Sequence, residues 1–230
     1  MSSPDYFSKF PNIDYTVYMN KAGVKENISI KDYFHLLRVR DGLFKFETLY
    51  EPYYINNGER PDQISYNEYN DEQYYWIILQ INDIVDYYNQ WPLSMVELDE
   101  YITKKYGTSA DDIHHYETRT IIDKDGNVLL EGRGTPGPDR GGIGRSGLTV
   151  SKDFEFTYKD GGVYKTVKGP DGVAPACIGI TNRQYEYDQN EDKSQIYLLK
   201  KRYIKDYVRE IDKYTRDIEL LQSELSMSDT

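Results

Sequence analysis

The stretch YYINNGERPDQISYNEYNDEQYYWIILQIND, residues 53–83, decides most of what the sequence predicts about the fold. It begins as extended chain, turns at Asn57-Gly58 and enters a helix with Pro61 in its first turn, where the missing N–H of proline is not needed. A second helix over residues 72–82 is apolar on most sides and is therefore expected to be buried. These features predict a strand–helix–helix module.

The module extends toward the C-terminus by one more helix. Ser94 and Glu97 have the spacing of a capping box, in which each side chain hydrogen-bonds the backbone of the other, and they predict a helix over Met95–Tyr106. We therefore expect a single module over residues 45–106.

Residues 1–44 predict an N-terminal arm with one short helix, which Ser29 caps and which covers residues 30–39. The opening residues MSSPDYFSKFPNIDY lack a basic segment followed by an apolar run, so they do not form a secretory signal. No stretch approaches the roughly 18 consecutive apolar residues of a membrane span. The sequence thus predicts a soluble protein that is made in a cytoplasm.

Residues 107–187 change to β-structure. Hairpins are predicted over Thr118–Glu131 and over residues 154–167, because both contain alternating strand patterns around Gly-containing turns. The segment between them, residues 131–147, is too rich in Gly and Pro for regular structure and is expected to be a loop. This region is predicted to be a small β-hairpin subdomain.

Residues 188–230 return to helix, so the fold class expected for the whole chain is α+β. Apolar side chains recur with heptad spacing over three heptads of this long C-terminal helix. Such a stripe suits either a partner helix or packing on the helix's own domain, and the terminal position and 3.5-residue spacing favour the partner. The stripe comprises Ile204, Tyr207, Ile211, Tyr214, Ile218, Leu221 and Leu225.

The charge of the chain is unevenly distributed. The 230 residues carry a formal net charge of −11, and the window from Glu51 to Glu100 holds eleven acids and one base, Arg60, which gives 1 − 11 = −10. Such a surface repels phosphate backbones, anionic membranes and anionic wall polymers. The 24 tyrosines supply apolar area with a polar tip, which suits interfaces as well as cores. The composition argues for protein partners, and the single cysteine, Cys177, excludes an intrachain disulfide.

Two G-x-G-x-x-G patterns, Gly132–Gly137 and Gly142–Gly147, match the motif of dinucleotide sites. Such a site needs the pattern to open a helix whose N-terminus holds the pyrophosphate. Pro136 and Pro138 block a helix after the first pattern, and residues 148–150 predict a strand after the second. We therefore expect no nucleotide site and no cofactor.

A second candidate site is a cluster of metal-ligand residue types around the adjacent histidines His114 and His115. Zinc ligands usually come from more than one element, and adjacent histidines on an extended segment point to opposite faces. We expect a solvated strand entry here and no metal. The sequence also contains no nucleophile elbow, H-E-x-x-H or Cys–His motif, so no catalytic residue is assigned, and a glycosidase carboxylate pair is left open without support. The cluster comprises Asp111, Asp112, His114, His115 and Glu117.

The order of several short elements resembles the baseplate wedge subunit fifty-three family of T-even-type contractile-tailed phages. The resemblance covers about 60% of the chain, and the order of the elements carries it more than any single motif. A final Asn-Glu element leads into the C-terminal helix, as in that family. The elements are Tyr53-Tyr54, Arg60-Pro61-Asp62, Tyr75-Trp76, Asn82-Asp83, Trp91-Pro92, Asp111–Tyr116 and Asn190-Glu191-x-Lys193.

The first of these stretches is also similar to a LysM-type module, with its strand, Gly turn, two helices and Asn. In wall-binding modules of that type the fold grips N-acetylglucosamine polymers, so a glycan-binding protein or wall-targeting phage component is the alternative function. This sequence has Gly58-Glu-Arg-Pro-Asp62 where the wall-binding modules open with Gly-Asp-Thr-Leu, which argues against sugar binding. The wedge resemblance implies a docking domain instead.

The wedge resemblance implies a non-catalytic structural subunit of the virion's tail baseplate, assembled in the host cytoplasm and present in multiple copies within a symmetric assembly. Its implied partners are other wedge proteins, a sheath-initiator-like protein and the central hub protein, with no nucleic acid and no membrane. The subunit would clamp neighbouring wedge proteins and link wedges around the hub. The side chains expected to anchor these interfaces are Tyr53, Tyr87, Tyr88, Trp91, Ile204, Tyr207, Ile211, Tyr214 and Ile218.

Overall fold

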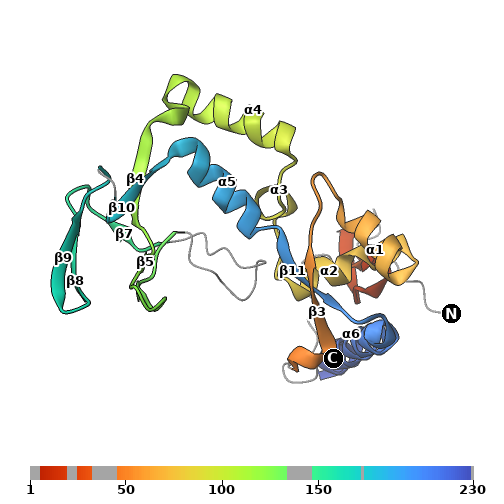
Figure 1. Ribbon diagram of the computed structural model, residues 1–230. Helices are drawn as coiled ribbons and strands as arrows, with labels where there is room; N and C mark the ends of the chain where they lie inside the picture. The colour runs from red at the N-terminus through yellow and green to blue at the C-terminus, as the bar shows by residue number, and fades with distance from the viewer. Residues whose placement is uncertain (1–5, 20–24, 33–45, 134–146, 172–173, 229–230) are drawn as a thin grey trace. The chain divides into compact units, whose positions relative to one another are not determined.

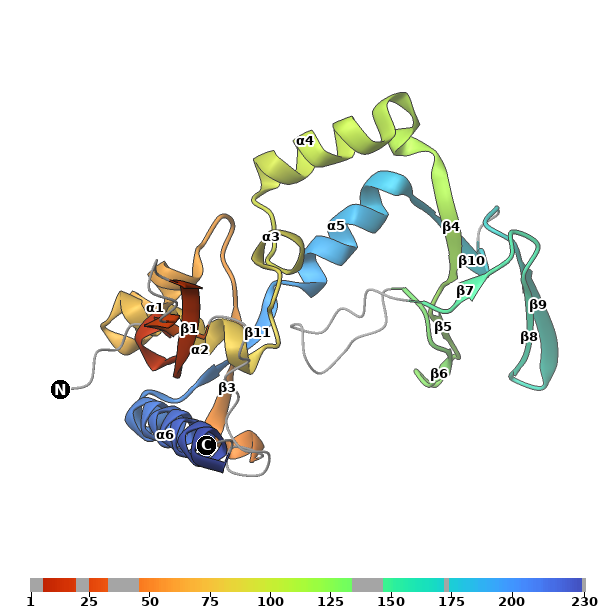
Figure 2. The same ribbon diagram turned by 180° about the vertical axis from the view of Figure 1, so that it is seen from behind.

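The computed structural model describes residues 6–19, 25–32, 46–133, 147–171 and 174–228. The chain divides into two compact units: unit 1 comprises residues 1–92 and 194–230, and unit 2 comprises residues 93–193. Helices and small antiparallel sheets occur in both units, which confirms the predicted α+β class (Figures 1 and 2).

Unit 1 is built around a two-stranded antiparallel sheet. Its strands are β3 (Tyr50–Tyr54) and β11 (Gln195–Leu199), which are far apart in sequence and lie side by side in Figures 1 and 2. The predicted helices follow β3 as α1 (Pro61–Tyr69) and α2 (Tyr75–Ile81), and α2 packs against β11. The strand β11 corrects the prediction for residues 188–230, which were expected to be helical.

The core of unit 1 combines these elements with both ends of the described chain. The helix α6 (Ile204–Ser228) packs against the 3₁₀ turn η1 (Tyr6–Lys9), and the ring of Tyr6 stacks on that of Trp76 with centroids 5.4 Å apart. The ammonium group of Lys9 pairs with Asp212 at 2.8 Å. The predicted arm is therefore attached to its own unit at these residues. Buried core residues include Phe10, Ile64, Trp76, Ile77, Ile78, Leu198, Leu199 and Ile211.

The remainder of the described arm is a hairpin. Strands β1 (Asn12–Met19) and β2 (Lys25–Lys31) pair antiparallel. The predicted helix is wrong at its start, because Ser29 and Ile30 lie in β2, where Ile28 and Ile30 alternate with polar residues at the two-residue period of a strand. The rest of that predicted helix, from residue 33 onward, lies outside the described residues.

Unit 2 contains two longer helices and several short strands. The helix α4 (Met95–Tyr106) begins with the predicted Ser94–Glu97 capping box and packs against α5 (Asn182–Asp192). The predicted module 45–106 therefore ends earlier in the structure, at Pro92, because α4 packs within unit 2. Leu98, Ile102 and Ala110 form the buried centre of this packing.

The strands of unit 2 form one three-stranded sheet and two hairpins. The sheet is antiparallel with the order β10 (Cys177–Thr181), β4 (Ile113–Thr118) and β7 (Thr149–Val150). The hairpins are β5 (Ile121–Ile122) with β6 (Val128–Leu130) and β8 (Glu155–Asp160) with β9 (Val163–Lys168).

The two hairpins were both predicted, and the second has the expected extent. The first is shorter than expected, because Thr118 belongs to β4 and pairs with Cys177. Of the predicted loop 131–147, residues 134–146 lie outside the described residues. Within the part of the chain that the structure describes, none of the helices combines the length and the apolar composition that a bilayer span requires.

Within each unit, short helical elements connect the longer helices and the strands. In unit 1 these are the 3₁₀ turns η2, η3 and η5 and the short helix α3, and in unit 2 the 3₁₀ turn η4. Their bounds are η2 (Glu47–Leu49), η3 (Glu72–Tyr74), α3 (Tyr87–Gln90), η4 (Gly107–Asp111) and η5 (Lys201–Tyr203).

Candidate functional site

The aromatic residues predicted as anchors near α3 separate into buried and exposed side chains. Trp91 is only 4% exposed, and its indole N–H donates to the carbonyl oxygen of Glu59 at 2.9 Å. Tyr87 is half-buried and stacks on Trp91, with ring centroids 5.8 Å apart. The neighbouring Tyr88 is 86% exposed. Of these three rings, Tyr88 is the one that is available to a partner.

Tyr53 is the fourth predicted anchor of the module, and its hydroxyl contacts the turn that follows β3. Its hydroxyl lies 3.0 and 3.1 Å from the two carboxylate oxygens of Glu59, which also accepts from the backbone and side-chain N–H groups of Asn56. Partial burial, together with the hydrogen bond and negative charge of Glu59, raises the pKa of Tyr53 to about 12. The hydroxyl of Tyr53 therefore stabilises the turn as a neutral donor.

The heptad stripe of the C-terminal helix faces the core of unit 1. Ile204, Tyr207 and Ile211 are buried, and the hydroxyl of Tyr207 donates to the side chain of Gln80 at 3.0 Å. The preference for a partner helix is therefore corrected over residues 204–211, because heptad spacing equally suits a helix that covers its own α/β core. The stripe becomes less buried farther along, with Tyr214 and Ile218 partly buried and Leu221 exposed.

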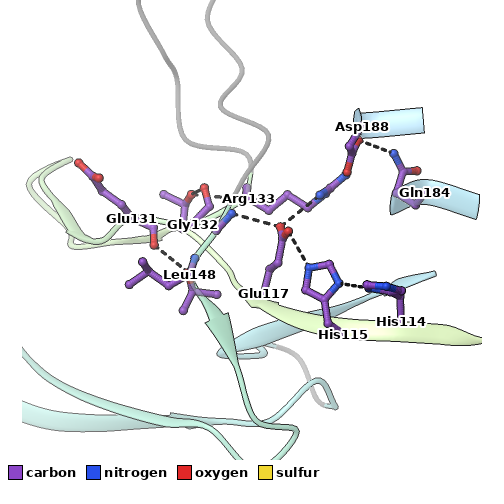
Figure 3. Close-up of polar contacts among 12 residues, drawn as sticks. His114, His115, Glu117, Glu131, Gly132, Arg133, Leu148, Gln184 and Asp188 are labelled. Carbon is purple, nitrogen blue, oxygen red and sulfur yellow. Dashed lines mark hydrogen bonds and ion pairs between the residues drawn. The ribbon is translucent and has the colours of Figure 1, made fainter. Parts of the chain in front are cut away.

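Unit 2 contains a polar cluster on β4, shown in Figure 3. The Nδ1 atoms of His114 and His115 lie 2.8 Å apart, and Nε2 of His115 lies 3.0 Å from a carboxylate oxygen of Glu117. The expectation that the two histidines point to opposite faces is wrong. The pairing of β4 with β10 shifts register between Ile180 and Thr181, which leaves His114 as an extra residue, and a bulge of this kind re-aims a side chain.

Glu117 is the centre of the cluster. Its Oε2 accepts from Nη1 of Arg133 at 3.2 Å and from the backbone N–H of Gly147 at 3.1 Å, while His115 contacts Oε1. Burial favours a raised pKa for Glu117, but these donors outweigh it and hold the pKa below its usual range. Arg133 also pairs with Asp188 of α5 at 2.7 Å (Figure 3), so the cluster joins the sheet to the helix within unit 2.

The charged groups of this cluster are paired with one another. Among the described residues, no group of three or more His, Cys, Asp and Glu side chains is placed to hold a metal ion. Asp111, a member of the predicted cluster, instead forms an ion pair with Arg183 at 3.1 Å. Because both oxygens of Glu117 already accept hydrogen bonds, this carboxylate is poorly placed to act as a general base.

Two glycines of the G-x-G-x-x-G patterns lie against Thr118. A methyl group added to Gly132 or Gly147 would overlap the carbonyl oxygen of Thr118. The hydroxyl of Thr118 donates to the carbonyl oxygen of Glu131 and accepts from the N–H of Leu148, both at 2.9 Å. A strand, β7, follows the second pattern as predicted. Glycine is needed at these two positions for close backbone approach.

Two asparagines outside the predicted sites bind backbone groups that are distant in sequence, each with both the oxygen and the nitrogen of its side-chain amide. Asn82 accepts from the N–H of Tyr197 and donates to its carbonyl oxygen, both at 2.8 Å. Asn190 accepts from the N–H of Leu93 at 2.7 Å and donates to its carbonyl oxygen at 2.9 Å. The sequence signal for these two asparagines is that they begin the Asn82-Asp83 and Asn190-Glu191 elements.

A comparison with protein families matches this chain to the model described as Base plate wedge protein 53. The match spans residues 6–127, just over half of the 230 residues. It includes the stretch from Tyr53 to Trp91 and the segment Asp111–Tyr116, whereas the Asn190 element lies beyond it. A comparison with curated proteins finds no match.

Proposed function

Since the chain belongs to the Base plate wedge protein 53 family, we propose that it clamps neighbouring wedge proteins and helps to link wedges around the central hub. Membership gives the chain a structural role in the baseplate of a phage tail. Clamping and linking are more specific roles than the family membership gives, and they are our proposal. The observation that carries them is that the family match runs through β3, α1, α2 and α3, where an exposed aromatic ring lies on a well-packed support.

A non-catalytic role is supported by the polar cluster of unit 2. Its one deeply buried carboxylate, Glu117, is 8% exposed and is surrounded by hydrogen-bond donors of its own chain. Such a group stabilises a fold more readily than it transfers a proton.

We also infer a LysM-like module composed of β3, α1, α2 and β11, in place of the continuous residues 45–106. The strand–helix–helix–strand order and the antiparallel pairing of β3 with β11 support this proposal. Residues 93–193 then form an insertion before the closing strand.

The proposed partners are other wedge proteins, a sheath-initiator-like protein and the central hub protein, in multiple copies that assemble in the host cytoplasm. The acidic window from Glu51 to Glu100 supports protein partners with basic surfaces, because opposite charges speed association and suppress wrong pairings. The same charge disfavours nucleic acid and anionic membranes.

Reconstitution tests the proposal. The other wedge proteins of the same phage are assembled with and without the full-length chain, and wedge joining is followed by sedimentation and electron microscopy. We expect the chain to bind wedges and to be required for their joining around the hub. Equal joining without the chain would remove the linking role. Saturable binding of chitooligosaccharide at millimolar concentration, with no binding to wedges, would establish the glycan-binding alternative.

A further inference from the structure

The segment that follows α2 and begins α3 displays two apolar side chains to solvent. Tyr88 is 86% exposed and Val85 is 80% exposed, which makes them the two most exposed large hydrophobic side chains among the described residues. They lie three residues apart in the sequence of unit 1: Val85 comes just before α3, which Figure 1 labels, and Tyr88 lies within it. We refer to residues 85–88 as the Val85–Tyr88 surface. Large apolar side chains that are this exposed within four consecutive residues suit a contact site.

The backbone beneath this surface is held in place by its own hydrogen bonds. The side-chain oxygen of Gln90 accepts from the N–H groups of Val85 and Asp86, both at 2.7 Å. The carboxylate of Asp86 caps α3 by accepting from both N–H groups of Asn89. Because this turn is already ordered, a partner that binds it loses little conformational entropy, which favours affinity.

The ring of Tyr88 is also supported from below. It packs edge-on against Tyr87, with centroids 5.7 Å apart, and Tyr87 stacks on the buried Trp91. Trp91 is in turn fixed by its hydrogen bond to Glu59. A tyrosine presented in this way resembles the rigid aromatic residues that dominate many protein interfaces, since only two side-chain torsions must be ordered.

The charge of this stretch of the chain indicates what kind of partner the surface fits. Asp83 and Asp86 are both exposed, and no Lys or Arg occurs between residues 61 and 103. Two copies of this surface would therefore repel each other, which argues against self-association. A protein surface that carries Lys or Arg around an apolar pocket would complement both the carboxylates and the exposed side chains.

We propose that the Val85–Tyr88 surface docks a neighbouring baseplate protein that presents an apolar pocket bordered by Lys or Arg. The inference rests on the proposed function, since it assigns a surface to the binding of a wedge partner. Tyr88 and Val85 enter the pocket, and the two aspartates meet the basic border. Tyr87 and Trp91 act as internal support and do not themselves contact the partner.

The test compares full-length variants for binding to wedges assembled from the phage's other wedge proteins. The variants are Tyr88→Ala and Val85→Ser/Tyr88→Ala, and the control is Tyr66→Ala, a tyrosine of α1 that is also exposed, at 61%. Tryptophan emission checks that unit 1 is folded, because both tryptophans lie in it. We expect the dissociation constant to rise on the order of ten-fold or more for Tyr88→Ala and to change little for the control.

The basic border is tested separately with Asp83→Asn/Asp86→Asn, since asparagine still caps a helix but carries no charge. We expect this variant to associate more slowly at low salt and to depend less on salt than the unmodified chain. If the salt dependence is unchanged, the inference that the partner's surface is basic is wrong.

The two proposals fail in different ways. If the unmodified chain does not bind wedges, the proposed function fails and this inference fails with it. If the unmodified chain binds and Tyr88→Ala binds equally well, only the Val85–Tyr88 surface is overturned, and the clamping role stands.

Discussion

The side-chain amide of Asn82 binds Tyr197 as a neighbouring strand would, at the outer edge of β11. Its oxygen accepts from the N–H of Tyr197 and its nitrogen donates to the carbonyl oxygen of Tyr197, both at 2.8 Å. On the other side, Tyr197 lies opposite Pro52 of β3. The polar backbone groups of Tyr197 therefore point away from β3 and toward Asn82, as in a non-hydrogen-bonded pair. Proline is tolerated opposite Tyr197 because no N–H is needed there.

Replacing Asn82 is therefore expected to destabilise unit 1. In Asn82→Ala the backbone groups of Tyr197 lose both partners, and we expect the free energy of unfolding to fall by about 1–3 kcal/mol. The measurement is urea unfolding followed by tryptophan emission, since Trp76 and Trp91 both belong to unit 1. Asn67→Ala, at an exposed position of α1, is the matched control and should remain within about 0.5 kcal/mol. Equal effects of the two changes would show that the Asn82 contact is dispensable.

Cys177 provides an independent reporter for unit 2. The residue is fully buried in β10, and burial, helped by the negative charges of Asp153 and Asp171, raises the pKa of its thiol. Because the thiolate is the reactive form, we expect labelling by an aromatic disulfide to be on the order of a hundred-fold slower in the native chain than in urea. Rapid native labelling would contradict the burial of this thiol.

Gly147 is expected to tolerate no side chain. In Gly147→Ala the new methyl group meets the carbonyl oxygen of Thr118, so the backbone of unit 2 must shift, at an expected cost of about 1–3 kcal/mol. The midpoint of urea-induced Cys177 labelling measures this. Gly179→Ala serves as the control, because its methyl group would meet the movable end of Ile113 at 3.2 Å. A larger loss in the control would reverse the interpretation.

Glu117 is expected to make unit 2 sensitive to acid. Its pKa is lowered in the folded state, so its contribution to stability is present above its ordinary value of 4.5 and is lost as the pH falls through the lower folded value. We expect Glu117→Gln to cost about 1.5–3 kcal/mol at neutral pH and to flatten the decline in stability between pH 6 and 3.

The acid measurement uses urea midpoints from pulse labelling of Cys177 with dithiodipyridine, which reacts with thiols in acid. Glu131→Gln changes an exposed carboxylate of the same unit and should keep the slope of the unmodified chain. If Glu117→Gln also keeps that slope, another group is responsible for the acid sensitivity.

The local elements of unit 1 were predictable from the sequence because their signals are local. The Pro61 start of α1, the apolar run of α2 and the Ser94–Glu97 capping box each specify an element within a few residues. The strand β11 carries no such signal. Its five residues, QIYLL, are bounded by helical patterns, and only pairing with β3, about 145 residues earlier, makes them a strand.

The candidate sites were less predictable for the same reason. Neither the burial of Trp91 nor the exposure of Tyr88 follows from the run Tyr87–Trp91, because Trp91 packs into a core built from distant elements and bonds the carbonyl oxygen of Glu59, more than 30 residues away. The contact between His114 and His115 depends on a bulge that only the pairing with β10 reveals. The sequence gives the residue types at each site, but the direction in which each side chain points depends on tertiary contacts.

The division of unit 1 between two distant parts of the chain affects how it is made. A ribosome releases β3, α1 and α2 before the whole of unit 2, residues 93–193, and only then supplies β11 and α6. At about 5–20 residues per second, the apolar faces of the early helices wait roughly 5–20 seconds for their closing strand. Unit 2 is continuous in sequence and can fold during that interval. We expect translation to finish unit 2 first, so that the nascent chain depends on chaperones in the gap before β11 emerges.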